Sequence, residues 1–262
     1  MKANRILASF AVVGLLAGGA VIAGPAPAND PQKAQIENAV HDYILKNPEV
    51  IVQALQSFQQ KQMEKARETI VETEKKSPQF VDVLFHQASD PVVGNPNGKV
   101  TVTEFFDYQC PHCVDMADIM DNLVAANPDL RVVLKEFPIR GPVSMFASKA
   151  ALAAQKQGKY AEFHKALMHP KAQPLTEASI LALAQSVGLN VEQLKTDMNT
   201  PAIDKQIKDT YKLAQDLQLI GTPVFFVGKT KLVSKDAKAS EIAFVPGQID
   251  QAQLQDIIKK MS

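Results

Sequence analysis

The chain has few of the residues that cross-link a fold or hold a metal ion. Its 262 residues include no tryptophan and two cysteines, Cys110 and Cys113. Two cysteines three positions apart close almost no loop, so a disulfide between them cannot staple a large fold. The five histidines are scattered without ligand spacing, whereas a structural zinc site needs four ligands. We therefore expect no bound metal and no other cofactor.

The chain also lacks an excess of charge of either sign. Lys and Arg together number 28, as do Asp and Glu, so the formal net charge is zero. A neutral chain is weakly attracted to nucleic acid or to an anionic membrane surface, so we expect no nucleic-acid partner. The sequence contains no phosphate-binding loop, catalytic triad or paired-carboxylate motif. The two cysteines are therefore the main candidates for chemistry.

The first residues have the layout of a secretory signal peptide. Lys2 and Arg5 precede an apolar run from residue 6 to residue 23, and small residues follow. We expect residues 1–28 to be removed on export. A retained membrane anchor is the alternative, but the run contains three glycines and has only about the minimum spanning length. In an oxidising compartment, two cysteines this close together are expected to cycle between thiol and disulfide.

Residues 29–78 are predicted to form a helical self-association segment. Residues 33–76 contain no glycine, and apolar side chains recur at helical spacing: Ile36, Val40, Ile44, Ile51, Leu55 and Phe58. Asn47 and Pro48 predict the start of a second, longer helix that ends near Lys76. So narrow an apolar stripe is not buried by the segment alone, and it favours a homo-oligomer through residues 33–76. Folding back on the rest of the chain is the alternative, and the number of copies stays open.

Residues 79–262 are predicted to form one α/β domain, because strand and helix patterns alternate along them. Strands are expected at residues 100–106, 131–137, 223–227 and 242–245, with helices at 114–126 and from Asp250 onward. Residues 142–219 are predicted to contain helices at 144–157, 160–168, 177–187 and 201–219.

The cysteines lie in Cys110-Pro111-His112-Cys113, where a predicted strand leads into a helix. Unpaired backbone N–H groups and the helix dipole stabilise a thiolate there, so Cys110 is the expected nucleophile. The dipole lowers a pKa by about one unit at most, so any larger fall in the Cys110 pKa needs a further hydrogen-bond donor or positive charge. His112 is the candidate, and an exposed polar residue without a role is the alternative.

Three motifs in this order resemble the DsbA-like thiol-disulfide oxidoreductases of the thioredoxin superfamily. They are Glu104-Phe105-Phe106, Cys110-Pro111-His112-Cys113 and Gly221-Thr222-Pro223. The resemblance covers roughly residues 80–262 and implies a thioredoxin-like fold with a helical insertion at about 142–219. It also implies a cis Thr222–Pro223 bond against the sulfurs, with residue 222 presented to an extended substrate. Threonine before this proline is commoner in the disulfide isomerases, whereas valine is typical of DsbA itself.

Glu104 alternates with Val102 and Phe106, so its carboxyl is expected to be buried beneath the redox pair. Burial without a partner is costly and raises the pKa of a carboxyl. Lys135 on the next predicted strand is the expected partner. We hypothesise that Glu104 accepts the proton of Cys113 when that thiol attacks a mixed disulfide. A purely structural buried pair is the alternative.

The sequence therefore predicts a periplasmic enzyme that forms or isomerises disulfide bonds in exported proteins. Cys110 would form the mixed disulfide and Cys113 would resolve it. The resemblance implies a membrane redox partner of the DsbB or DsbD kind. The N-terminal helices and Thr222 favour an isomerase similar to ScsC-like and DsbC-like enzymes. A pure DsbA-type dithiol oxidase and a copper-binding envelope protein are the alternatives, the latter because paired thiols suit Cu(I).

Overall fold

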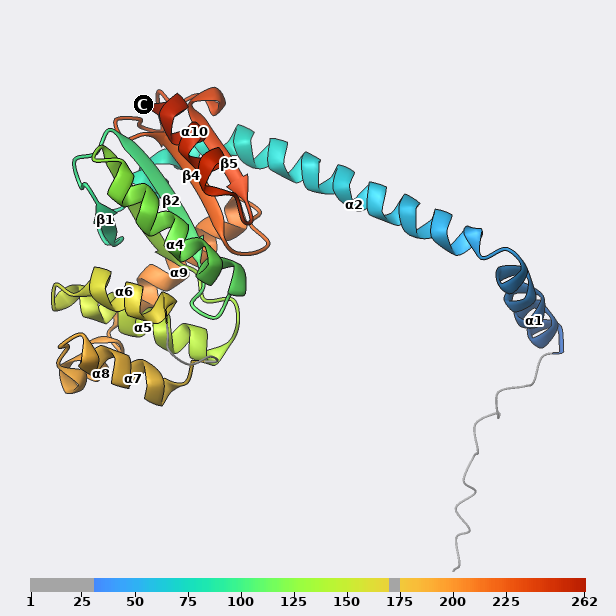
Figure 1. The fold of residues 1–262 in the computed structure, drawn as a ribbon, viewed down its shortest axis with the longest axis horizontal. Coiled ribbons are helices and arrows are strands. Elements are labelled where there is room, and N and C mark those ends of the chain that lie inside the picture. Colours follow the sequence, from blue (N-terminus) through green and yellow to red (C-terminus); the bar gives the residue numbers. More distant parts are fainter. Residues whose placement is uncertain (1–30, 170–174) are drawn as a thin grey trace, which may run out of the picture. The chain divides into compact units, whose positions relative to one another are not determined.

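The computed structural model describes residues 31–169 and 175–262, which form two units (Figure 1). The units are Met1–Gln60 and Lys61–Ser262. The predicted signal peptide at residues 1–28 lies outside the described residues. In the described part of the chain, no helix is both long enough and apolar enough to cross a membrane.

The first unit contains α1 (Pro31–Lys46) and the beginning of α2 (Glu49–Lys76). The break between the two helices falls at Asn47 and Pro48, as the sequence predicts. The side chain of Asn47 donates a hydrogen bond of 2.8 Å to the carbonyl of Tyr43. The Tyr43 carbonyl also accepts a hydrogen bond of 2.9 Å from the Asn47 backbone N–H, so both donors of Asn47 close the end of α1 just before α2 begins.

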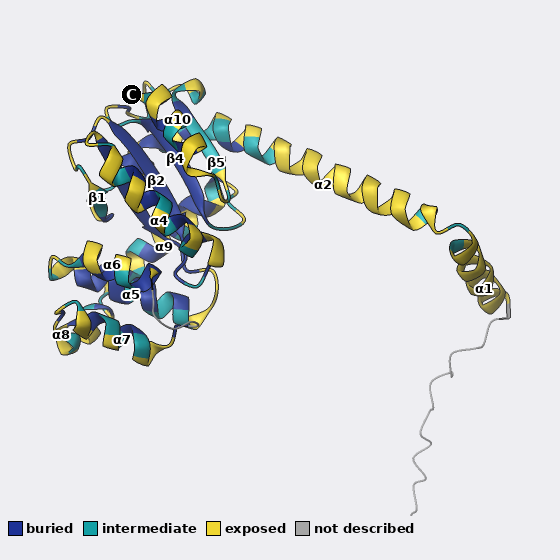
Figure 2. Ribbon diagram, in the orientation of Figure 1, coloured by how far each residue is buried: buried dark blue, intermediate teal, exposed yellow. Residues whose placement is uncertain are grey.

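The apolar stripe of these helices remains exposed. Ile36 is 64 % exposed, Phe58 59 %, Leu55 55 %, and Val40 and Ile51 52 % each, whereas Ile44 is half-buried. Figure 2 shows that exposure continues along α2 until its last turns, where Thr73 is buried. The last turns of α2 therefore belong to the second unit, which begins at Lys61.

The second unit is built on a five-stranded sheet of order β1-β3-β2-β4-β5. The strands are β1 (Val92–Gly94), β2 (Val100–Phe106), β3 (Leu130–Glu136), β4 (Val224–Lys229) and β5 (Ile242–Pro246). Strands β2 and β3 are parallel, and the other pairs are antiparallel. Every residue of β2 is buried, as expected for a central strand covered on both faces.

The parallel strands are joined by α4 (Pro111–Ala126), and the helical insertion follows β3. The insertion consists of α5 (Pro142–Lys156), α6 (Tyr160–Met168), α7 (Glu177–Ser186), α8 (Val191–Asp197) and α9 (Pro201–Asp216). The remaining elements are η1 (Ser77–Phe80), α3 (Val81–Phe85), η2 (Ala239–Glu241) and α10 (Gln251–Met261). The predicted α/β fold with an inserted helical domain is confirmed. The sequence patterns missed α8, α3 and β1, which are too short to show a period.

Alternate residues of β2 reach two separate parts of the core. Val102 and Phe106 pack in the cluster that contains both cysteines and the apolar faces of α4, α5 and α6. Phe105 packs in a second cluster with α3, the end of α9 and the start of β4. The redox pair therefore lies on one face of the sheet, and the segment that follows α2 covers the other.

Candidate active site

Cys110 and Cys113 lie where β2 leads into α4. Cys110 is the N-cap residue of α4, and Pro111 occupies the first turn, where a missing N–H costs nothing. The Cys110 carbonyl accepts hydrogen bonds from the backbone N–H groups of Cys113 and Val114, both at 3.0 Å. Both cysteines are free thiols and both are fully buried at 0 % exposure.

The pKa values of the two thiols are shifted in opposite directions. The pKa of Cys110 is lowered to about 5, chiefly by a hydrogen bond from the Cys113 thiol. Burial raises this pKa. The Thr222 side chain, the Cys113 backbone N–H and the charge of Arg140 lower it further. Burial, the hydrogen bond to Cys110 and the nearby Glu104 raise the pKa of Cys113 far above its ordinary value. Cys110 is therefore suited to act as nucleophile and leaving group, and Cys113 needs help to lose its proton.

The charge near Cys110 comes from a residue that the sequence patterns did not indicate. His112 is exposed, and no hydrogen bond or ion pair of its side chain is present in the described structure. Arg140, in the loop between β3 and α5, favours the Cys110 thiolate instead. No local motif marks Arg140, because it is brought to the redox pair only by the folding of that loop.

Asp107 connects the end of β2 to this loop. Its buried carboxylate accepts hydrogen bonds from the Gln109 N–H at 2.7 Å, the Arg140 N–H at 2.8 Å and the Ser144 hydroxyl at 2.7 Å. Three donors on one buried carboxylate offset its desolvation. Asp107 therefore fixes the backbone of Arg140 and the first turn of α5 beside the cysteines.

The Thr222–Pro223 peptide bond is cis, and Thr222 contacts the nucleophile. The Cys110 thiol donates to the Thr222 carbonyl at 3.3 Å. The buried Oγ1 of Thr222 has no hydrogen-bond partner among the residues described here. That hydroxyl is therefore free to donate to Cys110 when the thiol ionises.

Glu104 lies beneath the redox pair, as the strand alternation predicts. Its side chain is almost completely buried, and burial raises the pKa of its carboxyl to about 8. Glu104 and Cys113 line the same cavity of about 350 Å³, together with residues of α4 and α6. Within residues 31–169 and 175–262, no hydrogen bond or ion pair involves the Glu104 carboxyl.

The predicted pairing of Glu104 with Lys135 is wrong. In the parallel β2–β3 register, Glu104 lies opposite Leu134 and Lys135 lies opposite Phe105. Paired residues of adjacent strands point to the same face of a sheet, so Lys135 and Glu104 point to opposite faces. Alternation within each strand could not reveal this, because a shift of register by one residue exchanges the faces.

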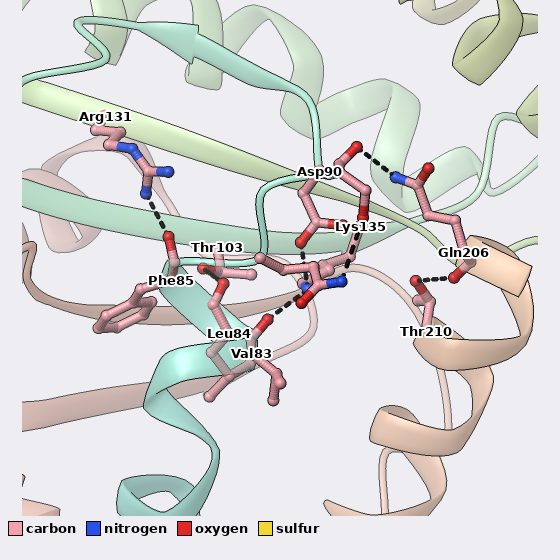
Figure 3. A network of polar contacts seen from close by, with 11 residues as sticks. Val83, Leu84, Phe85, Asp90, Thr103, Arg131, Lys135, Gln206 and Thr210 are labelled. Carbon is pink, nitrogen blue, oxygen red and sulfur yellow. Dashed lines mark hydrogen bonds and ion pairs between the residues drawn. The ribbon is translucent and has the colours of Figure 1, made fainter. Parts of the chain in front are cut away.

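Lys135 instead belongs to a polar network on the other face of the sheet (Figure 3). Its ammonium forms an ion pair with Asp90 and donates to the Val83 carbonyl at 2.6 Å. The side chains of Lys135 and Asp90 are each 3 % exposed. Burial lowers the pKa of Lys135 and raises that of Asp90, and each effect is opposed by the charge of the partner. Lys135 thus attaches both α3, through Val83, and the segment after it, through Asp90, to β3.

A second buried carboxyl, Glu136, was not found from the sequence. The Tyr108 and Tyr160 hydroxyls donate to its Oε1 at 2.9 and 2.6 Å, and burial raises its pKa to about 8. Tyr108 OH also lies 3.0 Å from His164 Nδ1. This network joins the segment before Cys110 to α6 of the helical insertion.

Two family profiles match the chain. The DSBA-like thioredoxin domain matches residues 101–259, which include the redox pair and the cis-proline. The profile described as the copper resistance protein ScsC N-terminal domain matches residues 32–65, in α1 and α2. The two matches together reach both units of the structure and leave residues 66–100 between them unmatched.

Solved structures are similar over most of the chain. A thioredoxin-like oxidoreductase from Silicibacter pomeroyi DSS-3 is 44 % identical, with a TM-score of 0.61, over 68 % of this chain and 95 % of that one. BcfH from Salmonella enterica Typhimurium is 31 % identical, with a TM-score of 0.65, over 88 % and 96 %. Proteus mirabilis ScsC in a compact conformation is 26 % identical, with a TM-score of 0.60, over 87 % and 96 %.

Curated relatives that match by sequence include longer proteins. The Na(+)/H(+) antiporter NhaA 1 of Mycobacterium sp. (strain KMS) is 29 % identical over 143 residues, which are 53 % of this chain and 23 % of the antiporter. The chain thus matches about a quarter of the length of these antiporters.

Proposed function

Because the chain belongs to the DSBA-like thioredoxin domain family, we propose that it is an exported thiol-disulfide oxidoreductase that forms and isomerises disulfide bonds in other exported proteins. The opposite acidities of Cys110 and Cys113, which share a hydrogen bond at the start of α4, are the observation that carries this proposal. A membrane protein of the DsbB or DsbD kind returns the cysteines to their starting redox state.

The reaction begins at Cys110. Its thiolate attacks one sulfur of a client disulfide, which forms a mixed disulfide and expels the other client sulfur as a thiolate. Cys113 then attacks Cys110 Sγ, which forms the Cys110–Cys113 disulfide and releases the client reduced by two electrons. The reverse sequence oxidises a client dithiol. In isomerisation, a different client thiolate attacks the mixed disulfide, so the client keeps its disulfide count and the enzyme leaves as a dithiol.

Thr222 holds the client beside the nucleophile. Its carbonyl already contacts the Cys110 sulfur, so an extended client segment placed against the backbone of Thr222 brings its own sulfur to Cys110. Ile220, two residues earlier, is 94 % exposed. An exposed isoleucine at this loop offers apolar contact to an unfolded client.

Glu104 removes the proton from Cys113. The pKa of Cys113 is raised far above its ordinary value, so this thiol attacks slowly without a base. Glu104 lines the same cavity and has a pKa of about 8. A base with a pKa near the working pH exchanges protons efficiently in both directions. The cavity provides the space through which that proton reaches solvent.

The Glu104→Gln variant should resolve mixed disulfides more slowly than the natural protein, by about tenfold or more. The pKa of Glu104 is about 8, so its basic form accumulates as the pH approaches 8. We therefore expect the natural resolution rate to rise between pH 6 and 8, and the variant's rate to respond less. Rapid-quench measurement of the mixed-disulfide lifetime across this range tests both expectations.

Glu136→Gln is the matched control for that measurement. Glu136 is also a buried carboxyl with a pKa of about 8, but it does not line the cavity that contains Cys113. Its variant should keep the natural pH profile. If the resolution rate and the reduction potential of Glu104→Gln equalled those of the natural protein, Glu104 would have only a structural role.

The N-terminal segment, residues 29–78, assembles copies of the chain through the stripe on α1 and α2. Apolar side chains exposed in a row along a helix favour association with another copy. Assembly places several redox sites around one client, which lets one site hold a client while others attack its remaining disulfides. Threonine at position 222, where valine is typical of DsbA itself, also favours isomerisation.

Refolding of ribonuclease distinguishes the two directions. Mature protein in glutathione buffer should restore activity to scrambled ribonuclease, and it should also oxidise fully reduced ribonuclease. Recovery from the reduced form alone would mean a dithiol oxidase, with the N-terminal helices serving another purpose. Activity on neither form would overturn the proposed function.

A further inference from the structure

The last turn of α2 is attached to the end of α9 by a buried hydrogen bond. Thr73 is fully buried, and its hydroxyl donates to the Leu217 carbonyl at 2.9 Å. Leu217 is the C-cap residue of α9 and is also fully buried. The last carbonyls of a helix have no partner within the helix, so Thr73 supplies one that would otherwise be missing.

The next residue, Gln218, adopts a conformation that glycine usually provides. Its φ is +57°, and the N–H groups of Gln218 and Leu219 close α9 on the carbonyls of Gln215 and Ala214 at 3.0 and 2.8 Å. Glycine is common at this position because a side chain strains the left-handed conformation. Contacts from outside α9 can offset this strain.

That support comes from α2. With its nitrogen toward Glu72 and its oxygen toward Lys76, the Gln218 amide bonds to Glu72 Oε2 at 3.1 Å and to Lys76 Nζ at 3.2 Å. Glu72 and Lys76 lie on either side of Thr73 in α2. Three neighbouring side chains of α2 thus hold two consecutive residues at the end of α9.

These two residues begin the loop that reaches the nucleophile. Residues 217–222 connect the end of α9 to Thr222, whose carbonyl accepts from the Cys110 thiol at 3.3 Å. The Leu217 side chain also packs in one core cluster with Val224, just beyond the cis-proline. The loop is therefore fixed at its start by α2 and at its end by the sheet.

We propose that Thr73 is a positioning residue for the active site, because it anchors the loop that holds Thr222 against Cys110. The last turn of α2 then has a function separate from the exposed stripe farther along the same helix. The proposal rests on the redox role of Cys110, but it concerns the acidity of that thiol and not client turnover. The Thr222 side chain lowers the Cys110 pKa by hydrogen bonding to the thiolate, so loosening the anchor withdraws that hydroxyl and should raise the Cys110 pKa.

The test is a Thr73→Val substitution in the full-length reduced protein. Valine keeps the shape of threonine and removes the hydroxyl. We expect the Cys110 pKa, followed by thiolate absorbance against pH, to rise by about 0.5 unit, a roughly threefold change in the ionisation equilibrium. Thr73→Ser should restore the natural value, because serine retains the hydroxyl. A Cys110 pKa equal to the natural one in Thr73→Val would overturn the proposal.

Thr69→Val is the matched control, one turn earlier on α2. The Thr69 hydroxyl donates to Lys65 within the same helix at 2.9 Å, so its loss should not move the Cys110 pKa. An equal shift in both variants would mean a general effect of altering α2. Gln218→Gly gives an independent second variant, because glycine accepts the positive φ and lacks the amide, and it should shift the pKa in the same direction.

A double-mutant cycle with Thr222→Val identifies the route. If Thr73 acts through Thr222, the Thr73→Val shift should largely disappear when the Thr222 hydroxyl is absent. A shift of full size in that background would contradict the proposed route. Because the readout is a thiol pKa, an inactive protein with the expected shifts would overturn the proposed function and leave this inference standing.

Discussion

Replacing Cys113 with serine should abolish turnover and leave the protein covalently attached to its clients through Cys110. Serine cannot attack the mixed disulfide, but its hydroxyl can still donate to the Cys110 sulfur. That hydrogen bond is the largest of the effects that lower the Cys110 pKa to about 5. The first step should therefore continue at close to its natural rate. Non-reducing gels and mass spectrometry after incubation with scrambled ribonuclease measure the trapped adducts.

Two further variants make this prediction specific. Cys113→Ala removes the hydrogen-bond donor as well as the resolving thiol, so it should form adducts more slowly than Cys113→Ser. Cys110→Ser should form almost none, because burial holds the remaining Cys113 in its thiol form and a thiol is a poor nucleophile. Equal trapping by the two serine variants would contradict the assigned roles. A protein that only bound Cu(I) through these thiols would trap no client in any variant.

Removing the stripe should give a monomer that oxidises clients but no longer isomerises them. The structure fixes where the chain should be shortened, because Thr73 and Ser77 are fully buried in the second unit. A protein that starts at Lys61, the first residue of that unit, keeps the anchor on α9 and loses the whole stripe. We expect scrambled-ribonuclease recovery to fall to the uncatalysed level, with oxidation of reduced ribonuclease retained.

The same expectation can be tested in the full-length chain. Charged substitutions at Leu55 and Phe58, which are 55 % and 59 % exposed, should dissociate the assembly, because they place charge in the buried core of the interface. Gln56→Glu and Gln60→Glu are the controls. They alter exposed positions of the same helix outside the stripe and should leave the mass of the assembly unchanged. Light scattering coupled to gel filtration measures the mass. A monomer with undiminished isomerase activity would contradict the prediction, because it would show that isomerisation does not require assembly.

Much of the active site could be predicted because its signals are local in sequence. Cys110, Pro111 and Cys113 lie within one helical turn, so their spacing alone places two sulfurs together at the start of α4. Strand alternation placed Glu104 on the same face as Val102 and Phe106, beneath the cysteines, since side chains alternate between faces with a period of two. The cis bond before Pro223 was expected from the resemblance, and the structure confirms it.

Other parts depend on residues that are far apart in the chain. Strand pairing decided the partner of Lys135, because the β2–β3 register places it on the face opposite Glu104. The folded loop after β3 brings the charge of Arg140 to Cys110, whereas the adjacent His112 is exposed. Thr73 meets Leu217 across 144 positions, and neither residue carries a motif.

The sequence by itself therefore identified the redox pair of this protein, and the tertiary structure decided which groups lie around that pair. Motif spacing and periodicity act within a few residues, where backbone geometry fixes the distances between side chains. Register, loop position and helix docking depend on how the whole core packs. These contacts place Arg140 and Thr222 beside a thiol that the sequence had already identified as the nucleophile, and they attach the end of α2 to the start of the loop that carries Thr222.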